Sequence, residues 1–462
     1  MTALADTATG SSIFSRPGSR TTPRRPLPRR RSELGLIVVG GIVVVFASLL
    51  PSLALTGQLP AHEITVIIGL VAIGLIVHFV NRRFLPDADP VLLPIALVLN
   101  GLGYVFISRL KTAGVGDNSG QQLAWTVIGV GIYVAVLVIV KRSRDLERYR
   151  YIMLAVAFGF LVAPLLPGIG ENINGARLWI HLGTTLAFQP VEIAKILLIF
   201  FFASYVIDKR ELLTYPSRRV GNHLTPDLRA FGPIGVASAM SLLIVLGEHD
   251  IGFSLLLFVV FLSLLWVSTG RWTYLAIGIA LFLLGTFIAA HFLPQLNARI
   301  TLWFDPWKYF NSPPPYAGAQ PVRGELAFAH GGLFGTGLGL GLYGGYQVLP
   351  APTNDFIFSI IGEELGLVGT TAVAVAYLFM VGCGVRAALG ARSEFAKLVA
   401  IGLTMLLGFQ AFLIMGGVTR ILPLTGVTLP FVSYGGSSLV ANYALLAIIM
   451  RISQEGHEPD PV

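Results

Sequence analysis

Charged side chains are scarce in this sequence. Only 12% of its 462 residues are Asp, Glu, Lys or Arg, whereas 54% are hydrophobic; a soluble domain usually has about 25% charged residues. Cysteine is scarcer still, because Cys383 is the only one, and this excludes a disulfide framework and a cysteine-based metal site. The composition therefore indicates an integral membrane protein.

The first 33 residues contain none of the long apolar runs that follow. Seven arginines lie between Arg16 and Arg31, among prolines, serines and threonines. Such a segment lacks the composition for a packed core, and we expect residues 1–33 to be a disordered basic tail. A nucleic-acid-binding arm is the alternative, but a basic tail directly before an apolar span is more simply an orientation signal. We therefore expect no nucleic-acid partner.

Apolar runs long enough to cross a bilayer recur along the rest of the chain. A hydrocarbon core of about 30 Å needs roughly 20 apolar residues per helix. The sequence therefore predicts an all-α polytopic membrane protein, and its first span is an anchor rather than a cleaved signal peptide. About twelve spans are expected, near 35–56, 63–80, 91–109, 122–140, 150–167, 187–207, 231–247, 251–269, 272–293, 357–387, 396–416 and 425–450.

The distribution of basic residues predicts how these spans are oriented. If the N-terminus is cytoplasmic, the inner segments hold 24 of the 32 Lys and Arg residues, and Lys195 lies within a span. Cytoplasmic loops carry such an excess of positive charge. We expect a multi-pass protein of the cytoplasmic membrane with both termini in the cytoplasm.

One outer segment, residues 294–356, is much longer than the others. It contains Pro313, Pro314 and Pro315 and the glycine-rich run 331–337. A loop this long is usually functional or disordered. Because it keeps apolar residues, we expect it to fold onto the membrane surface, partly as short helices.

Glu192 and Lys195 lie inside a predicted span that begins at Gln189 and Pro190. An ionisable residue at membrane depth is costly and usually faces protein or a water-filled cavity. The spacing of three places both side chains on one helix face. They either neutralise each other or line a cavity that receives an anionic headgroup.

Further acidic residues flank the outer ends of spans. Glu248 and Asp250 could hold a divalent metal or act in acid–base chemistry, or Asp250 could cap the next helix. Asp355 could likewise be a helix cap. Glu363 and Glu364 lie two turns deeper in the same span, where a capping role does not explain them.

Two arginines on the outer side run against the positive-inside bias. Arg177 and Arg420 are therefore candidates for binding phosphate in a bidentate way. The run Pro430 to Ser438 places a proline and two glycines in an apolar stretch, which indicates a broken helix around a cavity. Together these features favour an outward-facing site for a lipid phosphate.

These residues resemble the SEDS family of shape, elongation, division and sporulation proteins, whose main branches are RodA and FtsW. The resemblance covers residues 91–453 and implies a ten-helix core, preceded by two extra transmembrane helices in 34–90 and followed by a cytoplasmic tail, 454–462. The extra helices are most similar to actinobacterial RodA-type members. The motifs are Asn174-Gly175-Ala176-Arg177, Gln189-Pro190-x-Glu192-x-x-Lys195, Glu248-x-Asp250-x-Gly252, Asp355-Phe356-Ile357-Phe358, Gly362-Glu363-Glu364-Leu365-Gly366 and Pro430 to Ser438.

Membership of this family implies a peptidoglycan glycosyltransferase that polymerises lipid II in cell-wall elongation or division. It also implies a class B penicillin-binding protein as partner and a divalent cation, Mg or Mn. The sugar hydroxyl needs a carboxylate base, and the departing pyrophosphate needs cationic stabilisation. The residues expected to shape the substrate cavity are Arg177, Glu192, Lys195, Glu248, Asp250, Asp355, Glu363, Glu364, Arg420 and Ser437.

The expected catalytic residue is Asp305, in the large outer loop. The family's essential aspartate lies there in a pattern like Asp-Pro-x-Gly-x-Gly-Tyr-Gln, but this chain departs from it. Asp305-Pro306 matches the first, usually non-catalytic, of two such units, and Lys308-Tyr309-Phe310 replaces the second. Asp305 is still the only aspartate between Asp250 and Asp355. The candidate metal ligands are Glu248, Asp250 and Asp305.

Three other functions remain open from the sequence. A scaffold with this fold could recruit the transpeptidase without chemistry. A transporter of lipid-linked precursors would also have intramembrane charges and broken helices, but it is expected to show inverted repeats, and we find no internal similarity. A polyprenyl-phosphosugar transferase of another class would carry its acidic motif in the first outer loop.

Overall fold

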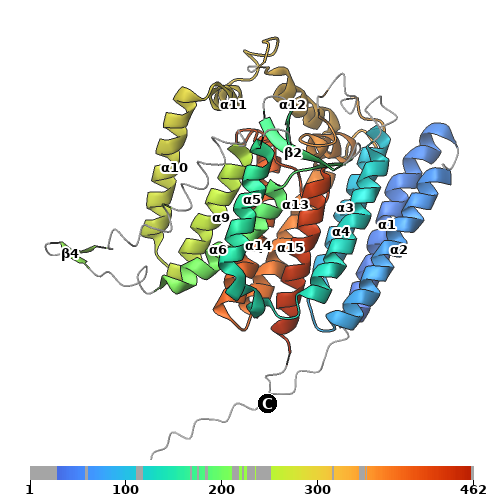
Figure 1. The fold of residues 1–462 in the computed structure, drawn as a ribbon. Helices are drawn as coiled ribbons and strands as arrows, with labels where there is room; N and C mark the ends of the chain where they lie inside the picture. The colour runs from blue at the N-terminus through green and yellow to red at the C-terminus, as the bar shows by residue number, and fades with distance from the viewer. Residues whose placement is uncertain are drawn as a thin grey trace, which may run out of the picture.

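The computed structural model describes residues 29–57, 61–110, 118–166, 169–173, 176–182, 186–210, 218–220, 223–225, 235, 251–314, 317–342, 349 and 351–458. Long, roughly parallel helices form a bundle, and the short helices α11 and α12 and a small sheet lie at the end opposite the last turn of α15 (Figure 1). The long helices are α1 (Arg29–Thr56), α2 (Ala61–Phe84), α3 (Leu92–Leu110), α4 (Ser119–Ile139), α5 (Arg150–Val162), α6 (Val191–Asp208), α9 (Ile251–Thr269), α10 (Trp272–Phe292), α13 (Ile357–Leu389), α14 (Glu394–Val418) and α15 (Gly436–Glu455).

Most of these helices are long and apolar enough to cross a membrane. Within the described residues, ten stretches meet that criterion, one of which joins α5 to the short helices η1 (Ser143–Tyr149) and η2 (Ala163–Leu165). The eighteen-residue α6 is not among them because it carries Glu192, Lys195 and Asp208. A helix satisfies its own backbone hydrogen bonds, which is the requirement in lipid. The predicted all-α polytopic fold is confirmed, and the predicted span 231–247 lies outside the described residues.

Two predicted spans differ from the structure. The span predicted at 357–387 is kinked, because Gly366 has a φ of 66° and interrupts the helix α13. The span predicted at 425–450 is helical only from Gly436, and residues 419–435 form turns and extended backbone. A proline at 430 and the glycines at 435 and 436 account for the second difference, since proline removes a backbone donor and glycine opens left-handed and extended conformations.

The helix α15 is the centre of the bundle and α10 its most peripheral member. Of the apolar window of each helix, 94% is buried in α15 and 6% in α10. α15 packs against α4, α6, α13 and α14. Because of these contacts, polar residues of α6, α14 and α15 such as Lys195, Gln410 and Ser438 lie inside the protein rather than facing lipid.

The first two helices pack on the side of this bundle, against α3 and α4 (Figure 1). A buried polar cluster joins them to α4, and we call it the Glu33 network: Arg30, Glu33, His78, Asn81 and Tyr133. Glu33 is fully buried, pairs with Arg30, lies 3.1 Å from His78 Nδ1 and accepts from Asn81 Nδ2 at 3.3 Å. The Tyr133 hydroxyl on α4 donates to Asn81 Oδ1 at 2.8 Å.

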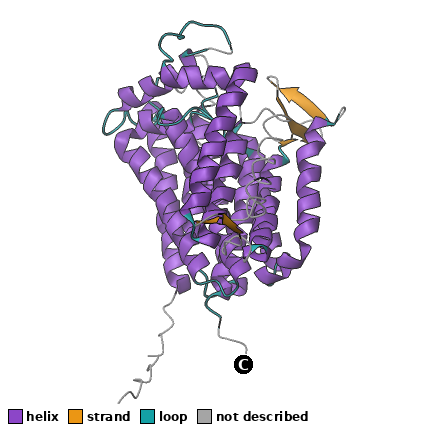
Figure 2. Cartoon of the chain, turned by 90° about the vertical axis from the view of Figure 1, so that its left-hand side faces the viewer, coloured by secondary structure: helices purple, strands orange, loops and turns teal. Residues whose placement is uncertain are grey.

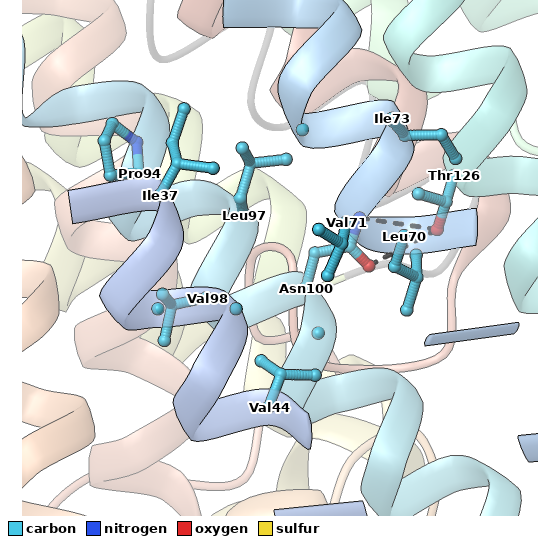
Figure 3. A pocket seen from close by; sticks show the side chains of 14 residues that line it. Ile37, Val44, Leu70, Val71, Ile73, Pro94, Leu97, Val98, Asn100 and Thr126 are labelled. Carbon is cyan, nitrogen blue, oxygen red and sulfur yellow. Dashed lines mark hydrogen bonds between the residues drawn. The ribbon is translucent and has the colours of Figure 1, made fainter. Parts of the chain in front are cut away.

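A pocket lies between α1, α2, α3 and α4 (Figure 3). Its wall is mainly apolar, with four of its lining positions occupied by Gly40, Gly41, Gly74 and Gly101. Asn100 and Thr126 supply the polar part and are hydrogen-bonded to each other at 3.3 Å. None of the predicted site residues lines this pocket.

The long outer loop contains two short helices, as predicted: α11 (Pro294–Phe304) and α12 (Ala319–Gly331). A small antiparallel sheet, β1 (Gly170–Ile173), β2 (Ala176–Leu182) and β3 (Leu186–Phe188), lies at the same end of the bundle (Figures 1 and 2). This sheet was not predicted from the sequence. A second hairpin, β4 (Arg218–Val220) and β5 (His223–Thr225), lies at the other end.

Candidate functional site

The ion pair predicted from the spacing of Glu192 and Lys195 is present on α6. Both side chains are buried, Lys195 with 1% exposure, and they form a salt bridge. Lys195 Nζ also donates to Gln410 Oε1 on α14 at 2.9 Å. The Gln410 amide in turn donates to the Thr428 carbonyl at 2.9 Å, and the Thr428 hydroxyl donates to Ser438 Oγ at 2.8 Å. We call these five residues the Lys195 network.

One side of the Lys195 network is formed by backbone that is not helical. Thr428 belongs to the irregular segment 419–435, and Ser438 lies in the first turn of α15. Next to it, Ser437 Oγ accepts from the Gln189 N–H at 2.7 Å, which ties the start of α15 to the start of α6. Irregular backbone at membrane depth is tolerated only inside protein or around a cavity. The prediction that Pro430 to Ser438 interrupts a helix is confirmed as far as residue 435, and the predicted cavity beside it stays a prediction.

Glu363 and Glu364 form a second buried cluster at the start of α13. Glu363 has no exposed surface, and its Oε1 accepts from Leu342 N at 2.6 Å and lies 2.9 Å from His330 Nδ1. Glu364 Oε2 accepts from Gly339 N at 2.9 Å and lies 3.1 Å from Arg109 Nη1. Both carboxylates are therefore held by the loop that follows α12 as well as by side chains.

The glycine-rich run after α12 wraps around the kink of α13. Thr336 N and Gly337 N donate to the carbonyls of Glu363 and Glu364, at 2.9 and 3.1 Å. A Cβ at Gly366 would collide with the backbone of Gly335, so no other residue fits there without displacement. This contact gives the glycine-rich run a structural role, which is to hold the kink of α13.

Asp305 and Arg420 lie at the end of the bundle that carries α11 and α12 (Figure 1). Asp305 follows α11, is exposed, and accepts through Oδ1 from the Lys308 N–H at 3.2 Å. Arg420 Nη1 lies 3.0 Å from Glu325 Oε1 on α12. The Trp303 indole donates to the Arg420 carbonyl at 3.1 Å and joins the end of α11 to the Arg420 turn, which we define as residues 417–422.

The remaining predicted residues are placed only in part. Arg177 lies in β2 opposite Asn172, and its side chain is outside the described structure. Glu248 and Asp250 lie outside the described residues, so the structure does not test their predicted metal or capping roles. The cap residue of α13 is Phe356, so the interpretation of Asp355 as that cap is wrong.

Four side-chain partners were not predicted from the sequence: Arg109, Glu325, His330 and Gln410. Arg109 lies in the last turn of α3, at the end expected to face outward, so the positive-inside bias that singled out Arg420 could have found it. A lone histidine and a lone glutamine gave no comparable signal, because their partners are 33 and 215 residues away.

Three cations of the predicted site or its partners differ in exposure, and each is paired with a carboxylate: Arg420 with Glu325, Arg109 with Glu364 and Lys195 with Glu192. Arg420 is partly exposed, Arg109 is nearly buried and Lys195 is fully buried. Cations in low-dielectric surroundings stabilise anions far better than they do in water. The structure therefore brings buried and half-buried ion pairs together with irregular backbone in an apolar helix bundle.

The family model for FtsW/RodA/SpoVE, described as cell cycle protein, matches residues 90–458 of this chain. The chain therefore belongs to the FtsW/RodA/SpoVE family. The matched region begins just before α3, so α1 and α2 precede it.

Curated relatives extend the comparison to these helices. The peptidoglycan glycosyltransferase RodA of Mycobacterium tuberculosis is 40% identical over 443 residues, which cover 94% of this chain and 92% of the relative. The part left uncovered is shorter than α1 and α2 together, so the match reaches into this pair. The probable peptidoglycan glycosyltransferase FtsW of Geobacter metallireducens is 33% identical and covers 81% of this chain and 96% of the relative.

A chain of a solved structure has the same fold. It is reported as "Structural coordination of polymerization and crosslinking by a peptidoglycan synthase complex" and superposes with a TM-score of 0.62 at 23% identity. The superposition covers 80% of this chain and 99% of the other. The fold of the family is thereby established for this chain.

Proposed function

We propose that this chain is a peptidoglycan glycosyltransferase that polymerises lipid II at the outer face of the cytoplasmic membrane, in cell-wall elongation or division. The observation that carries the proposal is its likeness, over nearly the whole chain, to relatives named for that activity. The buried cations near the outer end of the core support it, because lipid II is linked to its lipid through a pyrophosphate.

The orientation follows from the charge distribution. With both termini in the cytoplasm, 24 of the 32 Lys and Arg residues lie on the inner side. The helices α11 and α12 and the three-stranded sheet lie at the end of the bundle opposite the C-terminus (Figure 1). In the proposed orientation, the outer loop with Asp305, and the Arg420 turn that contacts it through Trp303 and Glu325, would face the side on which lipid II is polymerised.

The reaction joins an acceptor sugar hydroxyl to the anomeric carbon of a donor. The C–O bond to the pyrophosphate breaks, the pyrophosphate leaves with the electron pair, and the hydroxyl proton goes to a base. Asp305 is the predicted catalytic carboxylate, as base or as ligand of a cation. Arg420, Arg109 and Lys195 supply positive charge from the surface inward.

The described residues fit a divalent cation only with help from the substrate. No three His, Cys, Asp or Glu residues come together among the residues that the structure describes. Magnesium, however, is often bound by one or two carboxylates together with substrate phosphates. Asp305, an exposed residue, could hold such an ion, which would neutralise charge on the pyrophosphate.

We further propose a class B penicillin-binding protein as partner. The support is that the solved chain with the same fold comes from a peptidoglycan synthase complex that couples polymerization and crosslinking. Glycan strands released by a polymerase need a transpeptidase close by, and a complex supplies it.

Purified full-length protein, in complex with its penicillin-binding protein blocked by a β-lactam, tests the proposal. Labelled lipid II and Mg²⁺ should give glycan strands that separate on a gel. If wild-type complex gives no strands with Mg²⁺ or Mn²⁺, the polymerase assignment is wrong.

The scaffold function has one observation in its favour, the Lys308-Tyr309-Phe310 sequence that replaces the family's second acidic unit. A scaffold would bind the penicillin-binding protein and stimulate crosslinking of strands made by another enzyme, yet produce none itself. The same purified complex separates the two functions.

A further inference from the structure

Glu325 is an acidic residue that the family pattern did not single out, yet the structure places it beside Arg420. It lies in the second turn of α12, and its side chain is 28% exposed, that of Arg420 35%. The oxygen-to-nitrogen distance of 3.0 Å defines a direct ion pair. Because the pair is open to water on one side, a more highly charged anion can compete for the guanidinium.

Arg420 is held in an unfavourable backbone conformation. Its φ is 60°, a region that residues other than glycine rarely adopt. The conformation is fixed by the bond from the Trp303 indole to the Arg420 carbonyl and by the bond from Leu422 N to Gly416 O at 3.0 Å. Strain of this kind concentrates at functional sites, where the surrounding structure maintains it.

Asp305 lies close to this pair but differs from Glu325 in its contacts. It follows Trp303 by two residues, so at most about 7 Å of chain separates it from the residue that binds the Arg420 turn. One Asp305 oxygen already accepts the Lys308 N–H in a local turn. Glu325, by contrast, pairs with the guanidinium of Arg420, a cation suited to bind pyrophosphate.

We propose that Glu325 is the base of the glycosyl transfer and that Arg420 binds the pyrophosphate of the donor. This inference rests on the proposed polymerase function. Asp305 then acts at the pyrophosphate end, as a ligand for a divalent cation.

The ion pair links binding to chemistry. In the free protein Glu325 and Arg420 neutralise each other. A donor pyrophosphate, with more than one negative charge, takes the guanidinium, and the Glu325 carboxylate becomes available to a hydroxyl. The hydroxyl proton moves to Glu325, the hydroxyl oxygen bonds to the anomeric carbon, and the pyrophosphate leaves with the electron pair.

The test uses the full-length complex with a β-lactam-blocked penicillin-binding protein and labelled lipid II. The variant Glu325→Gln should lower kcat by about 100-fold or more and leave KM within about threefold. Arg420→Gln should raise KM as well as lower kcat. Glu325→Asp, which keeps a carboxylate, should recover part of the kcat.

Glu394→Gln is the matched control. Glu394 pairs with Arg210 at 3.4 Å, and both side chains are more than half exposed. The same chemical change in an ion pair at the cytoplasmic end should leave strand synthesis unchanged. Thermal unfolding of each complex shows whether Glu325→Gln remains folded.

A charge reversal separates chemistry from simple anchoring. If the pair only attaches α12 to the Arg420 turn, the double variant Glu325→Arg with Arg420→Glu restores the attachment and the activity. Restored activity, or a Glu325→Gln complex within threefold of wild type, overturns the inference while leaving the polymerase function intact. A wild-type complex without strand synthesis overturns both.

Discussion

The Glu33 network and the Lys195 network contain the same ingredients in different surroundings. Each buries a glutamate beside a cation, and each continues into neutral hydrogen-bonding side chains. The Glu33 network joins three regular helices, α1, α2 and α4. The Lys195 network joins two helices to the irregular segment 419–435 and to the start of α15.

The difference shows that buried charge alone does not identify a functional site. A cluster between regular helices can serve to dock them: the Glu33 carboxylate bonds to side chains of α1 and α2, and Arg30 Nε also donates to the Pro86 carbonyl just after α2, at 3.2 Å. A cluster that meets non-helical backbone has a neighbourhood that helix packing does not fill. We therefore propose docking as the role of the Glu33 network and substrate stabilisation as that of the Lys195 network.

The largest effect is expected at Lys195. Lys195→Met alone leaves Glu192 buried without its cation, which costs about 3–5 kcal/mol. The double variant Glu192→Gln with Lys195→Met removes both charges and should stay folded. It should still lose about 100-fold or more of its strand synthesis, because a preorganised cation is missing.

Thermal unfolding and the lipid II assay, done on the same preparations, measure the two effects. Gln410→Leu is the companion variant, since it removes the neutral partner of Lys195 and keeps the ion pair. Full strand synthesis by the folded double variant would show that the Lys195 network docks helices and does not stabilise the substrate.

Glu33→Ala should act in the opposite way. It removes the acceptor of His78 and Asn81 and the partner of Arg30, so we expect a loss of about 1–3 kcal/mol of stability. Strand synthesis per folded molecule should stay within about twofold, because the change is remote from the outer surface. Glu33→Gln, which keeps an acceptor, should lose less stability. A drop in activity without a drop in melting temperature would contradict the docking role.

The sequence predicted those features whose cause is local. The Glu192–Lys195 pair follows from helical spacing, and the break near Pro430 follows from proline and glycine in an apolar run. The partner of Lys195 did not follow, because Gln410 is 215 residues away. The kink of α13 is likewise set at a distance, since Gly366 packs on the backbone of Gly335. The pairing of Glu325 with Arg420 could not be read from either residue alone.

Two variants that each remove one hydroxyl should distinguish the Glu33 network from the Lys195 network with smaller effects. Tyr133→Phe removes a bond to Asn81, and Ser437→Ala removes the acceptor of the Gln189 N–H. Each should cost about 1 kcal/mol of stability. Ser437→Ala should also lower kcat by about tenfold, because it loosens the start of the helix that carries Lys195. Equal effects on activity from the two variants would remove the distinction between the networks.

The smallest effect is expected at the exposed pair of Arg210 and Glu394. Both groups are well solvated, and such pairs contribute at most about 1 kcal/mol and often nothing measurable. Glu394→Gln should leave melting temperature and strand synthesis unchanged at low and high salt. This pair has the same charges as the two networks. Unchanged melting temperature and strand synthesis would therefore show that the burial of a charge, and not its pairing, makes each network matter for stability or activity. A loss comparable to that of Glu33→Ala would instead indicate that ion pairing as such stabilises this fold.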